Sequence, residues 1–121
     1  MISGKLPKSS APLSHGFKGG NFVFTSGQVG TDPKTGEIAK GIEAQTRQCL
    51  ENLEAVLEAA GCSSRDVIKT TVFLADIRDF GAMNKVYEGF FNEPYPARST
   101  VEAKLANPNL RVEIEAIACK G

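Results

Sequence analysis

The most informative stretch of the chain is V-I-K-T-T-V-F-L-A, residues 67–75. Its β-branched and aromatic residues favour an extended strand. Alternation predicts two faces, one with Ile68, Thr70, Val72 and Leu74 and the other with Val67, Lys69, Thr71, Phe73 and Ala75. Because both faces are largely apolar toward the C-terminal end, we expect this strand to be central in its sheet or covered by a second subunit.

Helical patterns lie on either side of this strand. Residues 41–60 carry one apolar stripe with steps of three and four, which predicts an amphipathic helix ended by Gly61. The stripe consists of Ile42, Cys49, Leu50, Leu53, Val56, Leu57 and Ala60. A second helix is predicted to begin after Asp79 as its N-cap and to end before Pro94 and Pro96. The stripe expected to be buried on this helix is Phe80, Met83, Val86, Tyr87 and Phe90.

Four further segments are predicted to be extended. Residues 12–17 and 22–26 flank the turn signal K-G-G-N and look like a hairpin. Residues 98–104 follow the second helix, and residues 111–119 alternate. The two faces of this last segment are Val112, Ile114, Ala116 and Ala118, and Glu113, Glu115, Ile117 and Cys119. The order strand-strand-helix-strand-helix-strand-strand predicts an α+β fold, a sheet with two helices on one face.

Length and charge limit the class of protein. The 121 residues suit a single domain, 1–121. With 14 basic and 14 acidic residues the formal net charge is zero, which disfavours a dedicated nucleic-acid binder because such proteins need a basic excess. No apolar run approaches the ~18 residues of a membrane span. The first residues carry no apolar segment of a secretory signal, so we expect a cytoplasmic protein.

The chain offers little for metal, cofactor or nucleophile chemistry. His15 is its single histidine, and Cys49, Cys62 and Cys119 are scattered, so neither a metal-ligand cluster nor a cysteine–histidine pair is expected. Reduced thiols fit a cytosolic protein. The segment G-Q-V-G, residues 27–30, lacks the third glycine of a dinucleotide fingerprint. We therefore expect no cofactor and no metal.

Two charged residues stand in predicted strands. Arg98 begins the segment after the second helix, and Glu113 lies between Val112 and Ile114. A guanidinium suits a substrate carboxylate because its planar fork donates two parallel hydrogen bonds, and a nearby glutamate can activate a water. From spacing alone, charges on a solvated sheet face or one structural ion pair are the favoured interpretation, because most charges on strands are solvated.

Several motifs in order resemble the RidA (YjgF) family. They include P-A-R-S-T-V at 96–101, V-E-I-E-A-I-A at 112–118 and F-T-S-G-Q at 24–28. The turn D-P-K-T-G-E at 32–37 and the central strand at 67–76 match as well. Matches on the two helices are Gln45, Thr46, Arg47, Gln48, Glu51, Asn52, Leu53, Asn84 and Tyr87. The resemblance runs from about residue 11 to residue 118, which is nearly the whole chain.

The resemblance implies a fold, an assembly and an activity. Family members share a chorismate-mutase-like fold with a mixed sheet, and they form homotrimers whose sheets meet in a central barrel with ligand clefts between subunits. Their activity is hydrolytic deamination of reactive imines such as 2-iminobutanoate and 2-iminopropanoate, tautomers of the enamines 2-aminocrotonate and 2-aminoacrylate. The products are 2-oxo acids and ammonia. The expected partners are therefore small imino and 2-oxo acids and further copies of the chain, with no membrane and no nucleic acid.

The resemblance also assigns roles to single residues. Arg98 matches the arginine that binds the substrate carboxylate, and Glu113 matches the glutamate that holds and activates the attacking water. Positions lining the cleft correspond to Ser26, Gly27 and Asn84. Thr100 stands where many members have cysteine, and its backbone can still serve the site. The chemistry agrees with this assignment, because an imine is already electrophilic and needs only positioning, a water and a proton acceptor.

One segment departs from the family pattern. The chain has A-P-L-S at residues 11–14, where the family usually has G-P-Y-S with the tyrosine in the cleft. Leu13 has no hydroxyl, and losing one hydrogen bond to a charged group costs about 1.5–3 kcal/mol. We expect slower turnover or a bulkier apolar substrate. The sequence does not fix the direction of His15, two residues on, and solvent is favoured over the cleft because short polar segments mostly face solvent.

Two other functions remain open from the sequence. The first is a regulatory trimer that binds small carboxylates without turnover, which Leu13 makes credible. The second is an endoribonuclease or translation inhibitor, a role resembling one assigned to some family members. The neutral charge and the single histidine disfavour it, because RNA cleavage without a metal generally needs a general acid and a general base.

Overall fold

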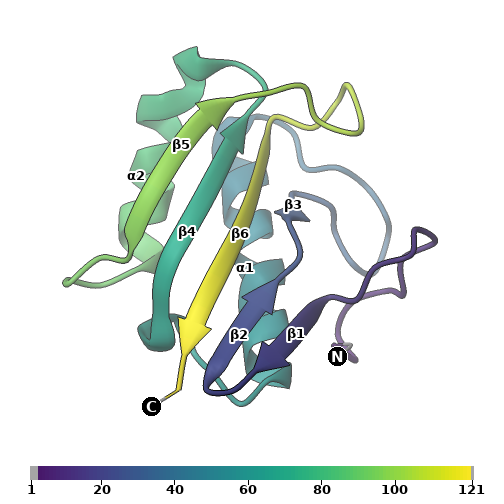
Figure 1. Ribbon diagram of the computed structural model, residues 1–121. Coiled ribbons are helices and arrows are strands. Elements are labelled where there is room, and N and C mark those ends of the chain that lie inside the picture. The colour runs from purple at the N-terminus through teal and green to yellow at the C-terminus, as the bar shows by residue number, and fades with distance from the viewer. Residues whose placement is uncertain (1–2, 121) are drawn as a thin grey trace.

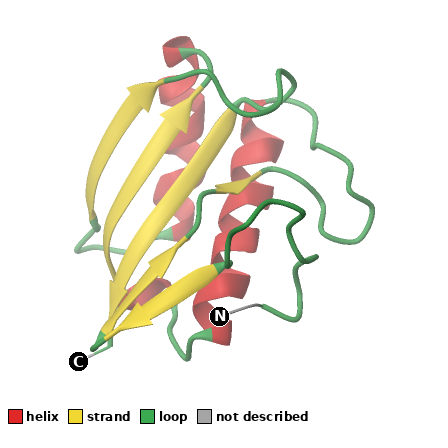
Figure 2. Cartoon of the chain, turned by 45° about the vertical axis from the view of Figure 1, so that its right-hand side comes forward, coloured by secondary structure: helices red, strands yellow, loops and turns green. Residues whose placement is uncertain are grey.

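The computed structural model describes residues 3–120, and within them one mixed sheet carries both helices on a single side (Figures 1 and 2). The strands are β1 (Gly16–Gly19), β2 (Phe22–Thr25), β3 (Gln28–Val29), β4 (Val67–Leu74), β5 (Ala97–Glu102) and β6 (Val112–Cys119). The helices are α1 (Ile42–Ala59) and α2 (Phe80–Phe90), with short 3-10 turns η1 (Ser64–Asp66) and η2 (Ile77–Asp79). The strand order is β1-β2-β6-β4-β5, and β3 pairs with β6. The predicted α+β fold with two helices on one face is confirmed.

The connection between β4 and β5 makes the sheet mixed. These two strands are parallel, and α2 lies in the crossover between them, as a parallel pair requires. All the other pairings are antiparallel. Strands β4 and β6 are the longest and occupy the middle of the sheet, as expected for the stretch 67–75.

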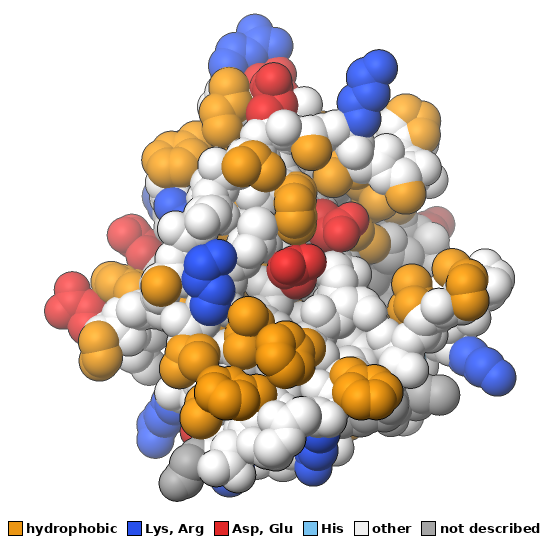
Figure 3. Space-filling model, in the orientation of Figure 1, with side chains coloured by type: hydrophobic (Ala, Val, Ile, Leu, Met, Phe, Trp, Pro, Cys, Tyr) orange, Lys and Arg blue, Asp and Glu red, His pale blue; other side chains and the backbone are white. Residues whose placement is uncertain are grey.

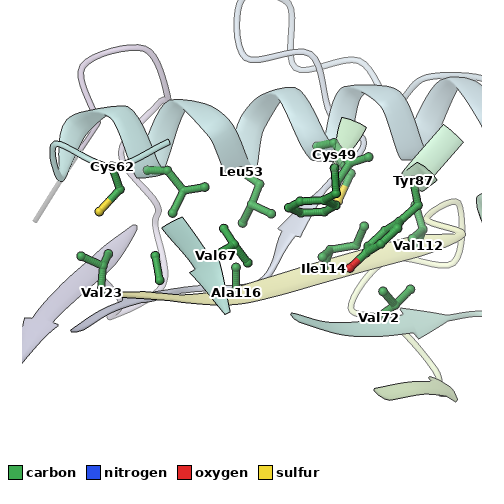
Figure 4. Packing of buried hydrophobic residues seen from close by; sticks show 14 of the residues in the cluster. Val23, Cys49, Leu53, Cys62, Val67, Val72, Tyr87, Val112, Ile114 and Ala116 are labelled. Carbon is green, nitrogen blue, oxygen red and sulfur yellow. The ribbon is translucent and has the colours of Figure 1, made fainter. Parts of the chain in front are cut away.

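The core lies between the helices and the sheet. Figure 4 shows side chains from α1 and α2 packed against those of β2, β4 and β6. The inner face of β6 is as predicted, with Val112, Ile114, Ala116 and Ala118 buried. The stripe predicted for α1 is buried too, except that Ile42 is partly exposed. Gly61 ends this helix with a φ of 78°, a conformation that glycine adopts without strain.

The predicted faces of β4 are wrong at its first two residues. The pairing with β6 shifts register between Val67 and Lys69, which is a β-bulge. As a result Val67 is buried in the core, whereas Ile68 is 47% exposed. Beyond the bulge the alternation holds, with Thr70, Val72 and Leu74 facing the helices.

The start of α2 also differs from its prediction. Phe80 is 41% exposed rather than buried, and Phe91, just after the helix, is buried instead. The helix begins after Asp79 as expected, but the Asp79 side chain makes no capping hydrogen bond. Its carboxylate forms an ion pair with Arg111 at 2.9 Å, and the local cap is formed by Asp76, which accepts from the backbone of Arg78. Because the 3-10 turn η2 leads directly into α2 and is itself capped by Asp76, the Asp79 side chain is not needed as a cap and can pair with Arg111.

Candidate functional site

Arg98 lies on the helix side of the sheet, at its β5 edge. In the parallel ladder it pairs with Thr70, whose side chain faces the helices. The guanidinium carbon of Arg98 stands 4.8 Å from the ring centroid of Tyr87 and 5.5 Å from that of Phe80, both on α2. Within residues 3–120 Arg98 forms no ion pair. Its charge is therefore supported by aromatic faces, and its N–H groups are available to an anion.

A cavity of about 340 Å³ opens beside this guanidinium. Its lining consists of Asn84, Tyr87, Glu88, Tyr95, Pro96 and Arg98. The Oδ1 atom of Asn84 and the Oγ1 atom of Thr100 are buried without a hydrogen-bond partner among the described residues. Thr100 follows Arg98 by two residues on the same face of β5. The structure thus groups three of the predicted site residues, Arg98, Asn84 and Thr100, on one side of the sheet.

Glu113 lies on the other face, near the middle of the sheet. It stands on β6 between Phe73 of β4 and Val29 of β3. A Cβ added to Gly27 would lie 2.1 Å from the Glu113 Oε2 atom, so Gly27 lets this carboxylate approach the chain closely. Burial, and secondarily the charge of Glu115, raises the pKa of Glu113 above its usual value. A carboxylate with a raised pKa is a stronger base at neutral pH.

Ser26 and Leu13 lie close to Gly27 in space. The Ser26 hydroxyl donates to the Ser14 carbonyl at 2.5 Å, and the Ser26 backbone donates to the His15 carbonyl at 2.8 Å. Leu13 is 52% exposed and lines a cavity of about 220 Å³ together with Gly27 and His15. These contacts give the predicted residues Ser26, Gly27 and Leu13 a common neighbourhood.

The direction of His15, which the sequence left open with solvent favoured, is inward. The ring is buried, and the Ser3 backbone donates to its Nδ1 at 2.9 Å. Since Nδ1 accepts, the proton is on Nε2, which donates to the Pro7 carbonyl at 3.0 Å. His15 therefore ties down the N-terminal segment, because its two ring nitrogens satisfy backbone groups that a packed segment cannot leave unpaired.

The predicted site residues form two groups that do not meet within one chain. Arg98 pairs with Thr70, and Glu113 pairs with Phe73, three residues farther along the same strand. An odd separation on one strand places side chains on opposite faces. We call the group of Arg98, Asn84 and Thr100 the arginine half-site, and the group of Glu113, Gly27, Ser26 and Leu13 the glutamate half-site.

The face that carries Glu113 is largely apolar and uncovered. Figure 3 shows hydrophobic side chains gathered around acidic ones near the middle of this face. Register and exposure assign five large exposed hydrophobic residues to it, namely Phe17, Phe22, Phe24, Ile68 and Val101. Phe17 is 70% exposed. Patches of this kind on a soluble domain mark interaction surfaces.

The sequence did not point to the aromatic residues of the arginine half-site. Phe80 and Tyr87 were assigned to a buried stripe, and Tyr87 also to the family resemblance, but neither was given a contact with Arg98, and Tyr95 was not singled out. Phe80 and Tyr87 are seven residues apart, which is two helical turns, so the same periodicity places them on one face. Their contact with Arg98 depends on the parallel pairing of β4 and β5, which periodicity does not encode.

No helix between residues 3 and 120 is long and apolar enough to cross a membrane. No group of three or more histidine, cysteine, aspartate or glutamate side chains in that range could hold a metal ion.

These features define a class: a small α+β protein with one sheet, two helices on one side, an apolar face on the other and an unpaired arginine in an aromatic cleft. The family model described as Endoribonuclease L-PSP matches residues 3–120. The chain is 55% identical over 121 residues to a RutC family protein from Pyrococcus horikoshii, covering 99% of this chain and 96% of that one. It is 46% identical over 117 residues to a 2-iminobutanoate/2-iminopropanoate deaminase from Salmonella typhimurium, covering 94% and 91%.

A solved structure, that of the YjgF gene product from E. coli, superposes with a TM-score of 0.92 at 42% identity and covers 99% of this chain and 97% of that one. The chain belongs to the Endoribonuclease L-PSP family, which is the RidA (YjgF) family. The family resemblance found in the sequence is thereby confirmed.

Proposed function

We propose that the chain is a deaminase that hydrolyses small reactive 2-imino acids, of the 2-iminobutanoate and 2-iminopropanoate type, to 2-oxo acids and ammonia. The observation that carries the proposal is the guanidinium of Arg98, which has no ion-pair partner in residues 3–120 and borders a cavity. The name of the Salmonella typhimurium relative supports the same reaction. Three free cysteines fit a reducing compartment, and we place the activity in the cytoplasm.

In the proposed reaction Arg98 binds the substrate carboxylate through two N–H groups. Glu113 accepts a proton from a water as the water oxygen bonds to the carbon of the protonated imine, and the C=N bond becomes single with its electron pair on nitrogen. The resulting carbinolamine collapses when Glu113 returns the proton to nitrogen. The C–N bond then breaks with its electron pair leaving on ammonia, the hydroxyl proton passes to the Glu113 carboxylate, and the C=O bond of the 2-oxo acid forms. No electron is gained or lost, and one water is consumed for each ammonia released.

This reaction needs both half-sites around one substrate. Since they lie on opposite faces of one sheet, we propose that each cleft combines the arginine half-site of one chain with the glutamate half-site of another. The uncovered apolar face supplies surface for such an assembly, and burying it favours association. We propose a homotrimer, for which light scattering should give three times the chain mass of 12.9 kDa. A species of one chain mass that retains full activity contradicts the shared cleft.

A coupled assay tests the activity. A pyridoxal-phosphate-dependent dehydratase acting on threonine or serine releases the enamine, and 2-oxo acid formation is followed with and without this protein. We expect acceleration by the wild-type protein and a loss of most of it in Arg98→Ala. Equal acceleration by Arg98→Ala rejects the role of Arg98, and absence of acceleration by the wild type rejects the enzyme. Tight binding of 2-oxobutanoate without acceleration would instead identify a carboxylate-binding regulator, which the missing hydroxyl at Leu13 makes the main alternative.

A further inference from the structure

We propose that Tyr87 is a positioning residue that holds Arg98 in its substrate-binding orientation, an inference that rests on the proposed role of Arg98. The ring of Tyr87 forms the nearer of two aromatic faces against the guanidinium, at 4.8 Å, and Phe80 forms the other at 5.5 Å. Tyr87 lines the cavity beside Arg98 but is only 5% exposed, so little of its ring surface is open to a ligand.

Tyr87 is fixed from the sheet as well as from its helix. Its hydroxyl shares a hydrogen bond of 2.7 Å with the Thr70 hydroxyl, which is fully buried. Figure 4 shows this oxygen directed from α2 toward the sheet. Thr70 is the residue that pairs with Arg98 in the parallel ladder. The same tyrosine therefore binds the β4 partner of Arg98 through its oxygen and supports Arg98 through its ring.

The ring of Tyr87 also packs against an aromatic neighbour. Phe91 lies 4.7 Å from Tyr87 between ring centroids, and Phe90 meets Phe91 edge-on at 4.8 Å. A tyrosine held by a hydrogen bond at its tip and by an aromatic neighbour has little freedom to turn. Its face is thus a fixed surface for the flexible side chain of Arg98.

The chemistry explains why an aromatic support suits this arginine. A carboxylate partner would hold Arg98 too, but it would occupy the N–H groups and offset the charge that attract a substrate. Stacking uses the face of the guanidinium and leaves its in-plane N–H donors free for a bidentate contact. The support therefore reduces the entropy lost when a substrate carboxylate binds, without competing for the donors.

The first test separates substrate binding from turnover. Tyr87→Leu removes the ring, and we expect KM for the imino acid to rise roughly tenfold, the size of a partly desolvated cation–π contact, while kcat changes less than about twofold. Tyr87→Phe keeps the ring, and Thr70→Val removes only the hydrogen bond, so both are expected within about threefold of wild type. Phe90→Leu makes the same aromatic-to-leucine change on α2 one aromatic contact farther from Arg98, and it should raise KM by less than about twofold.

The second test asks whether Tyr87 acts through Arg98. In the Arg98→Ala background, Tyr87→Leu should lower kcat/KM by less than about twofold, because the group that it positions is gone. Calorimetric binding of 2-oxobutanoate should follow the same pattern, and thermal unfolding identifies variants that do not fold.

Each outcome has a distinct meaning. If Arg98→Ala keeps the wild-type KM, the proposed function loses its carboxylate-binding residue, and the positioning role falls with it. If Arg98→Ala raises KM but Tyr87→Leu has the same effect with and without Arg98, Tyr87 is structural and the proposed function stands. If Tyr87→Phe is as impaired as Tyr87→Leu, the ring is not the support, and the inference is overturned.

Discussion

The two half-sites differ in what each needs to become functional. The arginine half-site is built from one chain: α2 supplies the aromatic support, β5 supplies Arg98, and the parallel pairing with β4 joins them. The glutamate half-site stands on an apolar sheet face that nothing within residues 3–120 covers. The first is completed by folding, whereas the second is completed, on our proposal, by assembly.

The two half-sites also differ in how the charge of Arg98 and the charge of Glu113 are stabilised. Arg98 is partly buried and has no ion-pair partner in residues 3–120, and two aromatic faces stabilise it. Glu113 is half-buried beside Glu115, with no cation within ion-pair distance among the described residues, and its pKa is raised. A positively charged iminium substrate placed next to Glu113 would supply the missing cation. The unfavourable environment of the free carboxylate thus favours binding of the charged substrate.

The largest effect is expected from Glu113→Gln. The amide cannot accept the proton of the attacking water, so kcat should fall by about a hundredfold or more. Glu115→Gln, two residues along the same face, is the matched control and should retain most of the activity. Steady-state kinetics in the coupled assay measures both variants, and a Glu113→Gln enzyme as fast as Glu115→Gln contradicts the base.

The raised pKa of Glu113 also determines the direction in which the stability of the folded chain changes with pH. The folded chain binds this proton more tightly than the unfolded chain, whose pKa is near the usual 4.5. The stability contributed by the protonated carboxyl is therefore present at acid pH and is lost as pH rises through the folded pKa. Activity runs the opposite way, since the base must be ionised. Glu113→Gln should consequently be at least as stable as wild type at neutral pH in thermal unfolding, and a lower stability there contradicts this account.

The next effect concerns sharing of the cleft between chains. Glu113→Gln and Arg98→Ala are each expected to be nearly inactive alone. When equal amounts are unfolded and refolded together, random assortment should give about a quarter of the clefts both wild-type residues, and activity should recover in that proportion. The control is the same treatment of each variant alone. Absence of recovery in mixed trimers shown by mass spectrometry places both residues in one chain's site.

Much of the fold could be predicted because the apolar residues of its longer helices and strands recur with a regular local spacing. The alternation of β6 and the stripe of α1 depend only on which residues each element buries. The exposed Ile68 could not be predicted, because the bulge arises from the pairing of β4 with β6. The residues of β3 were not predicted as a strand because two residues carry no detectable period.

The candidate site shows the same limit at a larger scale. Arg98 and Glu113 were found from the sequence as unusual charges and by family resemblance. Their separation onto opposite faces follows from the registers on β4, which only the sheet topology supplies. The helical spacing of Tyr87 predicts a buried core residue, which is correct, but this spacing gives no indication of its contact with Arg98.

A smaller effect is expected from Gly27→Ala. The added Cβ would clash with Oε2, Cδ and Cγ of Glu113, so the whole end of this side chain, from Cγ outward, must rotate away from its position. A displaced base should lower kcat by about tenfold. Gly89→Ala on α2, where a Cβ meets nothing within 4 Å, is the control and should leave kcat unchanged. If Gly27→Ala keeps wild-type kcat, the close approach of Gly27 does not position Glu113.

The smallest effect is expected from Leu13→Tyr. Leu13 is 52% exposed and lines the cavity beside Gly27, so a longer ring can be accommodated without repacking the core. Its hydroxyl would add one hydrogen bond to the glutamate half-site, and at an exposed position such a bond contributes about 0.5–1.5 kcal/mol, or a rise of roughly two- to tenfold in kcat/KM. Leu13→Phe adds the ring without the hydroxyl and separates the two contributions. A gain in Leu13→Phe equal to that in Leu13→Tyr would show that ring size, and not the hydroxyl, limits this half of the cleft.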